Sequence, residues 1–233
     1  MSAVARFGSF FGHGFGAVAG LCLLSMTGNS HAVTESALGS QSAHEIVAST
    51  TQSVMAVVEE ARTYADEDPD RYYREIDEIL APVIDYRGFA RSVMGAYARG
   101  DRYRSLSEEG QVQLRDQLER FTGVMRTGLV ATYSKGLLAF SGSRIEVSKP
   151  SDEEAGQTRV SVKQLIYSDE TQPYILIYQM GLNKEKQWKL RNIIIESVNL
   201  GEIYKNQFQA AARKHSGDLD VVIENWSTDE ADS

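Results

Sequence analysis

The spacing of apolar residues changes twice along the chain, from a helical period to an extended one and back. Between Ser36 and Leu137, apolar residues recur every three or four positions, which is the period of an amphipathic helix. From Ser143 to Ile195 they mostly alternate with polar residues, as in half-buried strands. After Leu200 the helical period returns. Helices followed by strands and then by helices predict an α+β fold rather than alternating βαβ units.

The helical region before the strands has recognisable boundaries. We expect helices over residues 36–64, 69–83, 85–95 and about 105–137. Asp68 and Pro69 supply an N-cap and a first-turn proline for the second helix, and Asp85 can cap the third. The fourth is expected to start near Ser105 or Ser107, and Ser105 with Glu108 has the spacing of a capping box. Gly128 is one of three glycines in that last helix, where a missing side chain lets another part of the chain or a ligand come close.

Four strands are expected, over residues 144–148, 158–167, 174–180 and 187–195. The connections between them are short, polar and rich in turn residues, so the pattern predicts a four-stranded antiparallel meander wrapped by helices. The third strand is apolar on both faces, which indicates burial on two sides, oligomerisation or an apolar ligand. In the fourth strand, Trp188, Leu190, Asn192 and Ile194 are expected to share one face. Two final helices are expected at about 200–215 and 218–226.

The N-terminal segment has the features of a secretory signal peptide. Residues 1–32 contain no acidic residue and one base, Arg6, followed by an apolar, glycine-rich stretch. Small residues at Ser30 and Ala32 fit cleavage after residue 32. An uncleaved anchor helix is one alternative, and a lipoprotein attached through Cys22 is another, although Leu21 is large for lipobox processing. Cleavage removes the only cysteine and predicts an exported protein without disulfides, which suits a bacterial periplasm.

Composition and charge exclude several classes of function. The chain has 233 residues and a net charge of −8, so nucleic-acid binding, which needs a dense cationic face, is not expected. The mature chain keeps only His44 and His215, far apart in sequence, and no motif typical of a metal site, a hydrolase triad or a phosphate loop is present. We therefore expect no metal and no cofactor. Asp85 and Asn192 interrupt apolar patterns, but helix capping and a structural hydrogen bond explain them better than acid–base chemistry.

Three stretches resemble the MlaC family of periplasmic phospholipid-binding proteins, also called toluene-tolerance auxiliary proteins. The first is ILAPVIDYRGFARSVMGAYARG, residues 79–100, in which Pro82, Asp85, Tyr86, Met94, Gly95 and Tyr97 match the family pattern. The second is LSEEGQVQLRDQLERF, residues 106–121. The third is WKLRNIIIESVNLGEIYKNQF, residues 188–208, with matches at Trp188, Glu196, Leu200, Tyr204 and Phe208. Ser197 departs from the family, which usually has glycine there, so a turn with positive φ would be strained at this residue.

The resemblance implies a fold and a function. It implies an α+β fold with an NTF2-like subdomain, in which an antiparallel sheet and helices enclose an elongated apolar cavity. It also implies a soluble, non-enzymatic carrier that moves phospholipid between an outer-membrane lipoprotein complex (MlaA with a porin) and an inner-membrane ABC transporter bearing the MCE-domain protein MlaD. With the residue patterns it suggests three segments: signal peptide 1–32, one lipid-binding domain 33–226, and an acidic flexible tail 227–233.

Strand parity and helical stripes give a set of candidate lipid-binding residues. They are Phe89, Met94, Phe121, Met125, Leu129, Tyr133, Val160, Val162, Leu176, Tyr178, Trp188, Leu190 and Ile194. Two other functions stay open from the residues alone: an enzyme on an NTF2-like scaffold, which needs a buried Asp or His pair facing a closed pocket, and a periplasmic adaptor without lipid cargo, which needs a filled interior.

Overall fold

The computed structural model describes residues 41–138, 144–168 and 172–228. The expected signal peptide, residues 1–32, and the last five residues of the expected tail lie outside the described residues. No helix within these three ranges is both long and apolar enough to cross a membrane.

The helices follow the expected order. Before the strands lie α2 (Ala43–Ala61), α3 (Pro69–Leu80), α4 (Tyr86–Met94), α5 (Gly100–Ser105) and α6 (Glu108–Leu138); after them lie α7 (Leu200–Lys214) and α8 (Leu219–Glu224). Two short 3₁₀ turns, η1 (Gly95–Ala98) and η2 (Asp152–Glu154), complete the helical elements. The four long helices expected before the strands are present, whereas α5 had no counterpart in the pattern. Its six residues, GDRYRS, are too few and too polar to show a helical stripe.

Two of the three expected caps are confirmed. The carboxylate of Asp68 accepts a hydrogen bond from the Arg71 amide at 3.0 Å, and that of Asp85 accepts one from the Gly88 amide at 2.9 Å. The expected pair Ser105–Glu108 is wrong, because Ser105 ends α5 and its hydroxyl donates to the Arg102 carbonyl. Ser107 caps α6 instead, accepting from the Gly110 amide at 3.2 Å.

The strands form one antiparallel sheet in the order β1-β2-β3-β4-β5. Strands β1 (Arg144–Val147), β2 (Arg159–Tyr167), β3 (Tyr174–Leu182) and β4 (Trp188–Ile195) correspond to the four expected ones. The fifth, β5 (Val198–Asn199), follows a tight turn and pairs with the end of β4. In that turn the positive φ falls on Glu196, at 58°, and not on Ser197, so the family departure at Ser197 causes no strain there. The Glu196 carboxylate also accepts from the Ile175 amide at 2.7 Å, which fastens the turn to β3.

A β-bulge in β4 reverses the expected parity of this strand. Tyr178 pairs with Ile193 and Met180 pairs with Leu190, so Arg191 is the extra residue between the two registers. Before the bulge, Trp188 and Leu190 share the face of Met180; beyond it, Ile193 and Ile195 take over that face. The expectation that Asn192 and Ile194 continue the face of Leu190 is therefore wrong.

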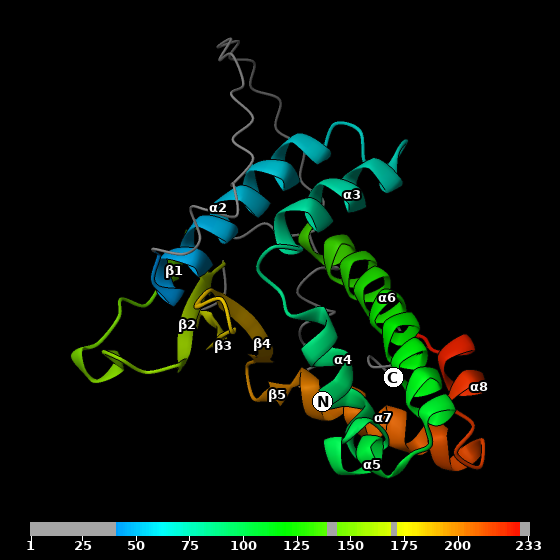
Figure 1. Ribbon diagram of the computed structural model, residues 1–233. Helices are drawn as coiled ribbons and strands as arrows, with labels where there is room; N and C mark the ends of the chain where they lie inside the picture. The colour runs from blue at the N-terminus through cyan, green and yellow to red at the C-terminus, as the bar shows by residue number, and fades with distance from the viewer. Residues whose placement is uncertain (1–40, 139–143, 169–171, 229–233) are drawn as a thin grey trace.

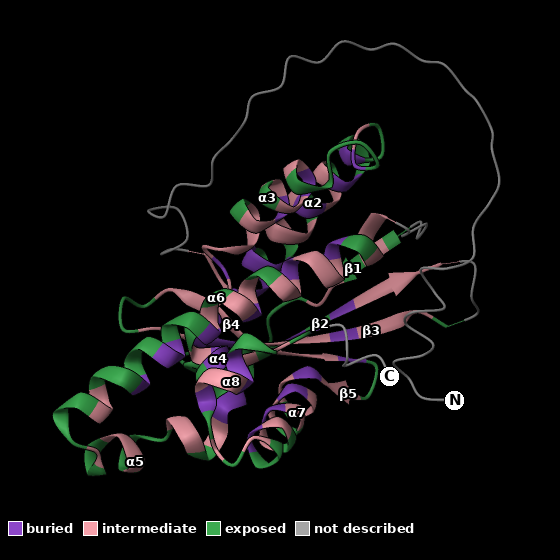
Figure 2. Ribbon diagram, turned by 90° about the vertical axis from the view of Figure 1, so that its right-hand side faces the viewer, coloured by how far each residue is buried: buried purple, intermediate pink, exposed green. Residues whose placement is uncertain are grey.

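The helices lie in two groups, one at each end of the molecule (Figure 1). Helices α2 and α3 lie side by side at one end of the molecule, α4, α5 and α7 lie at the other, and the long α6 runs between them beside the sheet. Figure 2 shows that the long helices combine buried with exposed faces, as amphipathic helices do. Between these layers, buried apolar residues form three clusters.

The largest cluster joins α4, α6, α7 and α8 to the ends of β3 and β4. Its centre is aromatic: the ring centroid of Phe121 lies 4.9 Å from that of Phe208 and 5.1 Å from that of Trp226. The second cluster packs the start of α2 on the sheet around Val162 and Met180. The third joins α2 and α3 to α6 around Val58 and Val130.

The packed domain extends at least to residue 228. Thr228 is only 5% exposed, and its hydroxyl lies 3.1 Å from that of Thr132 on α6. A Cβ on Gly128 would lie 2.5 Å from the Thr228 hydroxyl oxygen, so this glycine is what lets the end of the chain approach α6. Thr228 thus packs against α6, two residues beyond the boundary expected from the sequence.

Candidate functional site

A pocket of about 260 Å³ lies where the three apolar clusters meet. It is lined by residues from each cluster, for example Phe89, Val47 and Val54. The lining comes from helices α2, α3, α4, α6 and α7 and from strands β1 to β4. Most of its lining is aliphatic or aromatic. Because its walls come from segments across the whole sequence, the pocket depends on the complete fold.

Six of the thirteen candidate residues line this pocket. They are Phe89, Leu129, Tyr133, Leu176, Tyr178 and Leu190. The other seven lie elsewhere. Three are buried in the largest cluster: Met94, Phe121 and Met125. Val162 is buried in the second cluster, and Val160 and Trp188 pack against that cluster, whereas Ile194 lies on the opposite face of the sheet. The stripe along α6 explains part of the difference. Its first half packs against α7 and α8, whereas Leu129 and Tyr133 in its second half reach the pocket.

Sequence reasoning missed most of the wall that α2 and α3 provide. Thr50, Thr51 and Met55 of α2 and Ile76 and Leu80 of α3 line the pocket. The apolar stripes of both helices were visible in the sequence, but a stripe does not say whether it faces a core or a hollow. Ile193 and Ile195 also line the pocket, and only knowledge of the bulge would have found them.

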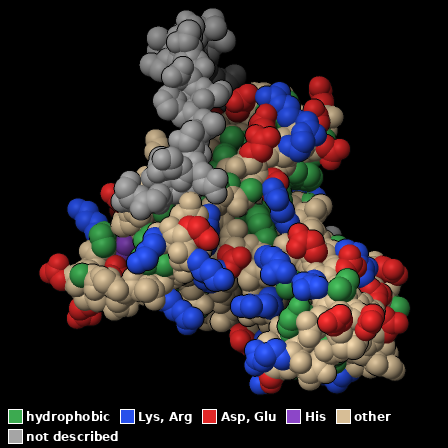
Figure 3. Space-filling view, viewed as in Figure 1, with side chains coloured by type: hydrophobic (Ala, Val, Ile, Leu, Met, Phe, Trp, Pro, Cys, Tyr) green, Lys and Arg blue, Asp and Glu red, His purple; other side chains and the backbone are tan. Residues whose placement is uncertain are grey.

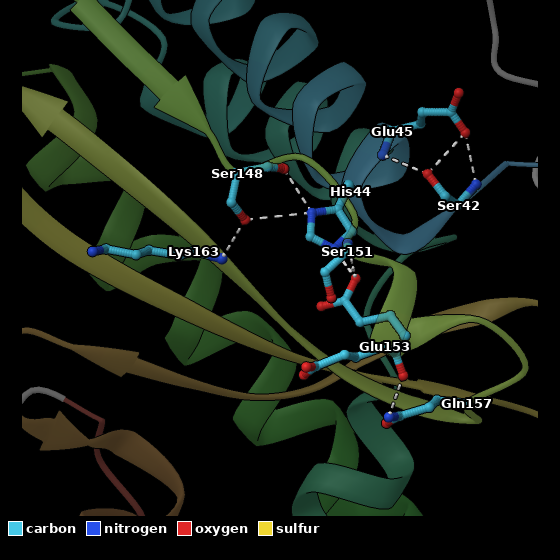
Figure 4. Close-up of polar contacts among 9 residues, drawn as sticks. Ser42, His44, Glu45, Ser148, Ser151, Glu153, Gln157 and Lys163 are labelled. Carbon is cyan, nitrogen blue, oxygen red and sulfur yellow. Dashed lines mark hydrogen bonds and ion pairs between the residues drawn. The ribbon is translucent and has the colours of Figure 1, made fainter.

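His44 connects helix α2 to residues that follow strand β1 (Figure 4). The ring of His44 is buried, and its Nδ1 donates to the Ser148 carbonyl at 2.6 Å. On the other side its Nε2 lies 2.8 Å from a carboxylate oxygen of Glu154, which in turn accepts from the Ser151 amide. The ring therefore links the first turn of α2 to the connection between β1 and β2, and it holds this wall of the pocket in place.

Polar side chains gather where α4 begins beside β4. Residues 83–85 pair with Leu190: the Leu190 amide donates to the Val83 carbonyl at 2.8 Å, and the Asp85 amide donates to the Leu190 carbonyl at 3.0 Å. This pairing sets Asp85 beside the bulged residue Arg191, and the two side chains form an ion pair. Asp85 thus caps α4 and holds the guanidinium, so the capping role expected for it is confirmed.

Asn192 has the structural role that the sequence favoured. Its amide nitrogen donates to the side-chain oxygens of Gln179 at 3.0 Å and Asn199 at 2.9 Å, and its oxygen accepts from the Gly201 amide at 3.0 Å. Asn199 is the N-cap of α7. Asn192 therefore fixes the start of α7 against the sheet.

The titratable groups of the pocket are tyrosines and one arginine. Burial raises the pKa of Tyr86 and Tyr178, so both phenols are neutral at physiological pH. No Asp, Glu, His or Cys is found among the residues that line the pocket, and the described ranges hold no cluster of such residues suited to a metal ion. The Tyr86 and Ser134 hydroxyls are buried and have no hydrogen-bond partner within the described chain. The site offers apolar surface and a few hydroxyl donors, which suit binding better than acid–base chemistry.

Comparisons with known proteins agree on one family. The family model described as MlaC protein matches residues 48–228. Toluene tolerance protein ttg2D of Pseudomonas putida is 26% identical over 191 residues, which cover 82% of this chain and 82% of that protein. A phospholipid-binding protein from Ralstonia solanacearum, solved in complex with a phospholipid, has a similar structure, with a TM-score of 0.58 and 21% identity. The similarity covers 82% of this chain and 97% of that one.

Proposed function

The chain belongs to the MlaC family, and from this premise we propose that it is a periplasmic phospholipid carrier. In this role it shuttles phospholipid between an MlaA-like outer-membrane lipoprotein complex and the MCE-domain, MlaD-like component of an inner-membrane ABC transporter. Such exchange maintains the lipid asymmetry of the outer membrane. The observation that carries the proposal is the pocket between the sheet and helices α2, α3, α4 and α6, with its largely apolar wall.

The physical demand on such a carrier is to replace the bilayer. Each methylene group exposed to water costs about 0.8 kcal/mol, so two chains of about 16 carbons would cost about 25 kcal/mol in the periplasm. A wall of Ile, Leu, Val, Met, Phe and Tyr side chains recovers this free energy without any chemical step. The phospholipid held by the similar protein from Ralstonia solanacearum supports the same cargo here.

The volume of the pocket bounds how the cargo is held. A volume of about 260 Å³ lies slightly below the usual range for ligand pockets, which begins at about 300 Å³. In this proposal, acyl chains lie between the sheet and the pair formed by α2 and α3. These helices contact the sheet mainly through the start of α2, where His44 lies.

The charge of the chain favours delivery through protein partners. A net charge of −8 repels the anionic surface of membrane leaflets, so the loaded carrier does not adhere to them by charge alone. Contact with the membranes then depends on docking to the partner complexes, which supports a shuttle that moves between them.

The lining of the pocket favours a carrier over an enzyme and over an adaptor without lipid cargo. An enzyme on this scaffold would need a buried carboxylate or imidazole aimed at the pocket, and its lining residues include neither. An adaptor without cargo would be expected to fill this interior with side chains. Both observations support a carrier without catalytic activity.

Native mass spectrometry of the purified mature protein tests the proposal. We expect the released ligands to be diacyl phospholipids, because the pocket needs hydrocarbon to exclude water. After removal of the lipid, incubation with phospholipid vesicles should restore the bound mass. A protein that is empty when purified and stays empty with vesicles would contradict the carrier function.

A further inference from the structure

A second, polar pocket adjoins the apolar one. It is lined by residues of the β3–β4 turn and by those that flank it, and it shares Ile84 and Arg191 with the apolar pocket. The two pockets therefore meet at Ile84 and Arg191, and we infer that one elongated molecule lies in both. Its apolar part would face the wall of the first pocket, and its polar part would reach the second.

The β-bulge directs Arg191 to this junction. In a regular strand, Arg191 would share its face with Lys189 and Ile193, but the bulge leaves it without a cross-strand partner on β3. Asp85 holds one end of its guanidinium by an ion pair, and the Leu182 carbonyl lies 3.5 Å from a second nitrogen. A guanidinium has five N–H donors, so Arg191 keeps donors for a ligand while its orientation is fixed.

The second pocket has an excess of positive charge in an otherwise acidic protein. Lys184, Lys189 and Arg191 line it, against the two carboxylates of Asp85 and Glu185. The Lys189 ammonium donates to the Pro82 carbonyl at 2.6 Å, which brings a second cation to the chain segment that precedes α4. Figure 3 shows Lys and Arg side chains gathered over the middle of the face that the sheet and α4 share. An anionic group next to the apolar pocket would be bound here by charge and hydrogen bonds.

We propose that Arg191 binds the phosphate of the phospholipid head group at the junction of the two pockets, with Lys189 beside it. This inference rests on the proposed carrier function and adds a head-group site to it. The acyl chains lie in the apolar pocket, and the phosphodiester accepts hydrogen bonds from the guanidinium that Asp85 orients. The site selects lipids that carry a phosphate over uncharged lipids with the same chains.

A competition between two lipids tests the site. Protein stripped of lipid is incubated with vesicles that hold equal amounts of phosphatidylglycerol and diacylglycerol with identical acyl chains, and native mass spectrometry gives the ratio bound. We expect the wild type to favour phosphatidylglycerol and Arg191→Gln to lower the ratio about tenfold, the usual size of one charge-assisted hydrogen bond. Arg191→Lys should lower it less, because the charge remains.

Two further variants make the result specific. Asp85→Asn keeps an oxygen for the Gly88 amide but removes the charge that orients the guanidinium, so the ratio should fall, by less than in Arg191→Gln. Arg213→Gln removes an exposed charge at the end of α7, outside both pockets, and should leave the ratio unchanged. Circular dichroism confirms that each variant is folded.

The outcomes separate this inference from the carrier function. If wild type and Arg191→Gln bind both lipids in the same ratio, the head-group site is wrong and the carrier function stands. If the wild type takes up neither lipid, the carrier function itself fails. A drop in the ratio that Arg213→Gln reproduces would mean that overall charge, and not Arg191, sets the preference.

Discussion

Leu129 and Val162 show how differently two aliphatic residues can serve this protein. Leu129 lies in the second half of α6 and lines the pocket. Val162 lies in β2, is fully buried and packs with Val83 and Met180 in the second cluster. Both belong to the candidate lipid-binding set, but of the two only Leu129 lines the pocket.

Substitution of each residue by Trp should therefore have a different result. Leu129→Trp puts an indole into the pocket and should lower the lipid bound per protein by roughly fivefold or more, with little change in stability. Val162→Trp has no space to occupy and should destabilise the fold by about 1–3 kcal/mol or more. Native mass spectrometry measures the first effect, and urea unfolding measures the second.

Leu129→Met is the control, because it keeps both volume and apolar character and should bind lipid as the wild type does. If Leu129→Trp retains full lipid occupancy, the pocket described here is not the lipid site. If Val162→Trp is as stable as the wild type, the second cluster is less tightly packed than the structure indicates.

At the scale of elements, the position of α2 depends on a few contacts at its start. The helix begins with a capping box in which the Ser42 hydroxyl accepts from the Glu45 amide. The buried ring of His44 then joins the helix to Ser148 and Glu154, which lie more than a hundred positions further along the chain. Because α2 forms one wall of the pocket, these contacts link the stability of the helix to the shape of the site.

His44→Leu should destabilise the protein by about 2 kcal/mol, because the Ser148 carbonyl loses its donor and the Glu154 carboxylate loses its contact with the ring, while the volume is nearly kept. Urea unfolding should show a lower midpoint with an unchanged slope. His215→Leu provides the comparison: the structure shows no side-chain hydrogen bond from His215 to the described residues, so its effect should stay below about 0.5 kcal/mol. Equal midpoints for the wild type and His44→Leu would contradict the anchoring role.

At the scale of the whole molecule, the pocket lies at the meeting point of all three apolar clusters. Atoms that line an empty pocket here lack the van der Waals contacts that a filled core would give them. The protein without a ligand is therefore less stable than one with a filled interior. Under the proposed function, a lipid in the pocket would restore these contacts and bind only the folded chain, so the cargo would form part of the interior of the protein.

Removal of lipid should lower the melting temperature. At a lipid concentration of about a thousand times Kd, binding stabilises the fold by about 4 kcal/mol, which corresponds to roughly 10 °C for a domain of this size. Differential scanning calorimetry of loaded and stripped protein measures the shift. Glycerophosphocholine, a head group without acyl chains, should not restore it, and an identical melting temperature in both states would contradict a lipid-filled interior.

The sequence by itself determined every helix except α5, and strands β1 to β4 with their order, because each depends on the local period of apolar residues and on caps such as Asp68 and Asp85. It also determined the family, through motifs that stay together along the chain. It could not show the β5 strand, whose two residues are too few for a period, nor the cap at Ser107, which competed with an equally plausible Ser105.

Only the tertiary structure decided which apolar residues face the pocket. Met125 and Leu129 lie one turn apart on α6, but Met125 is fully buried in the largest cluster, whereas Leu129 lines the pocket. The bulge at Arg191 depends on how β4 pairs with β3, and it moved Ile194 away from the pocket and Ile193 into it. Local periodicity says which side of an element is apolar; what lies opposite that side is set by segments distant in sequence, and their packing alone divides core from cavity.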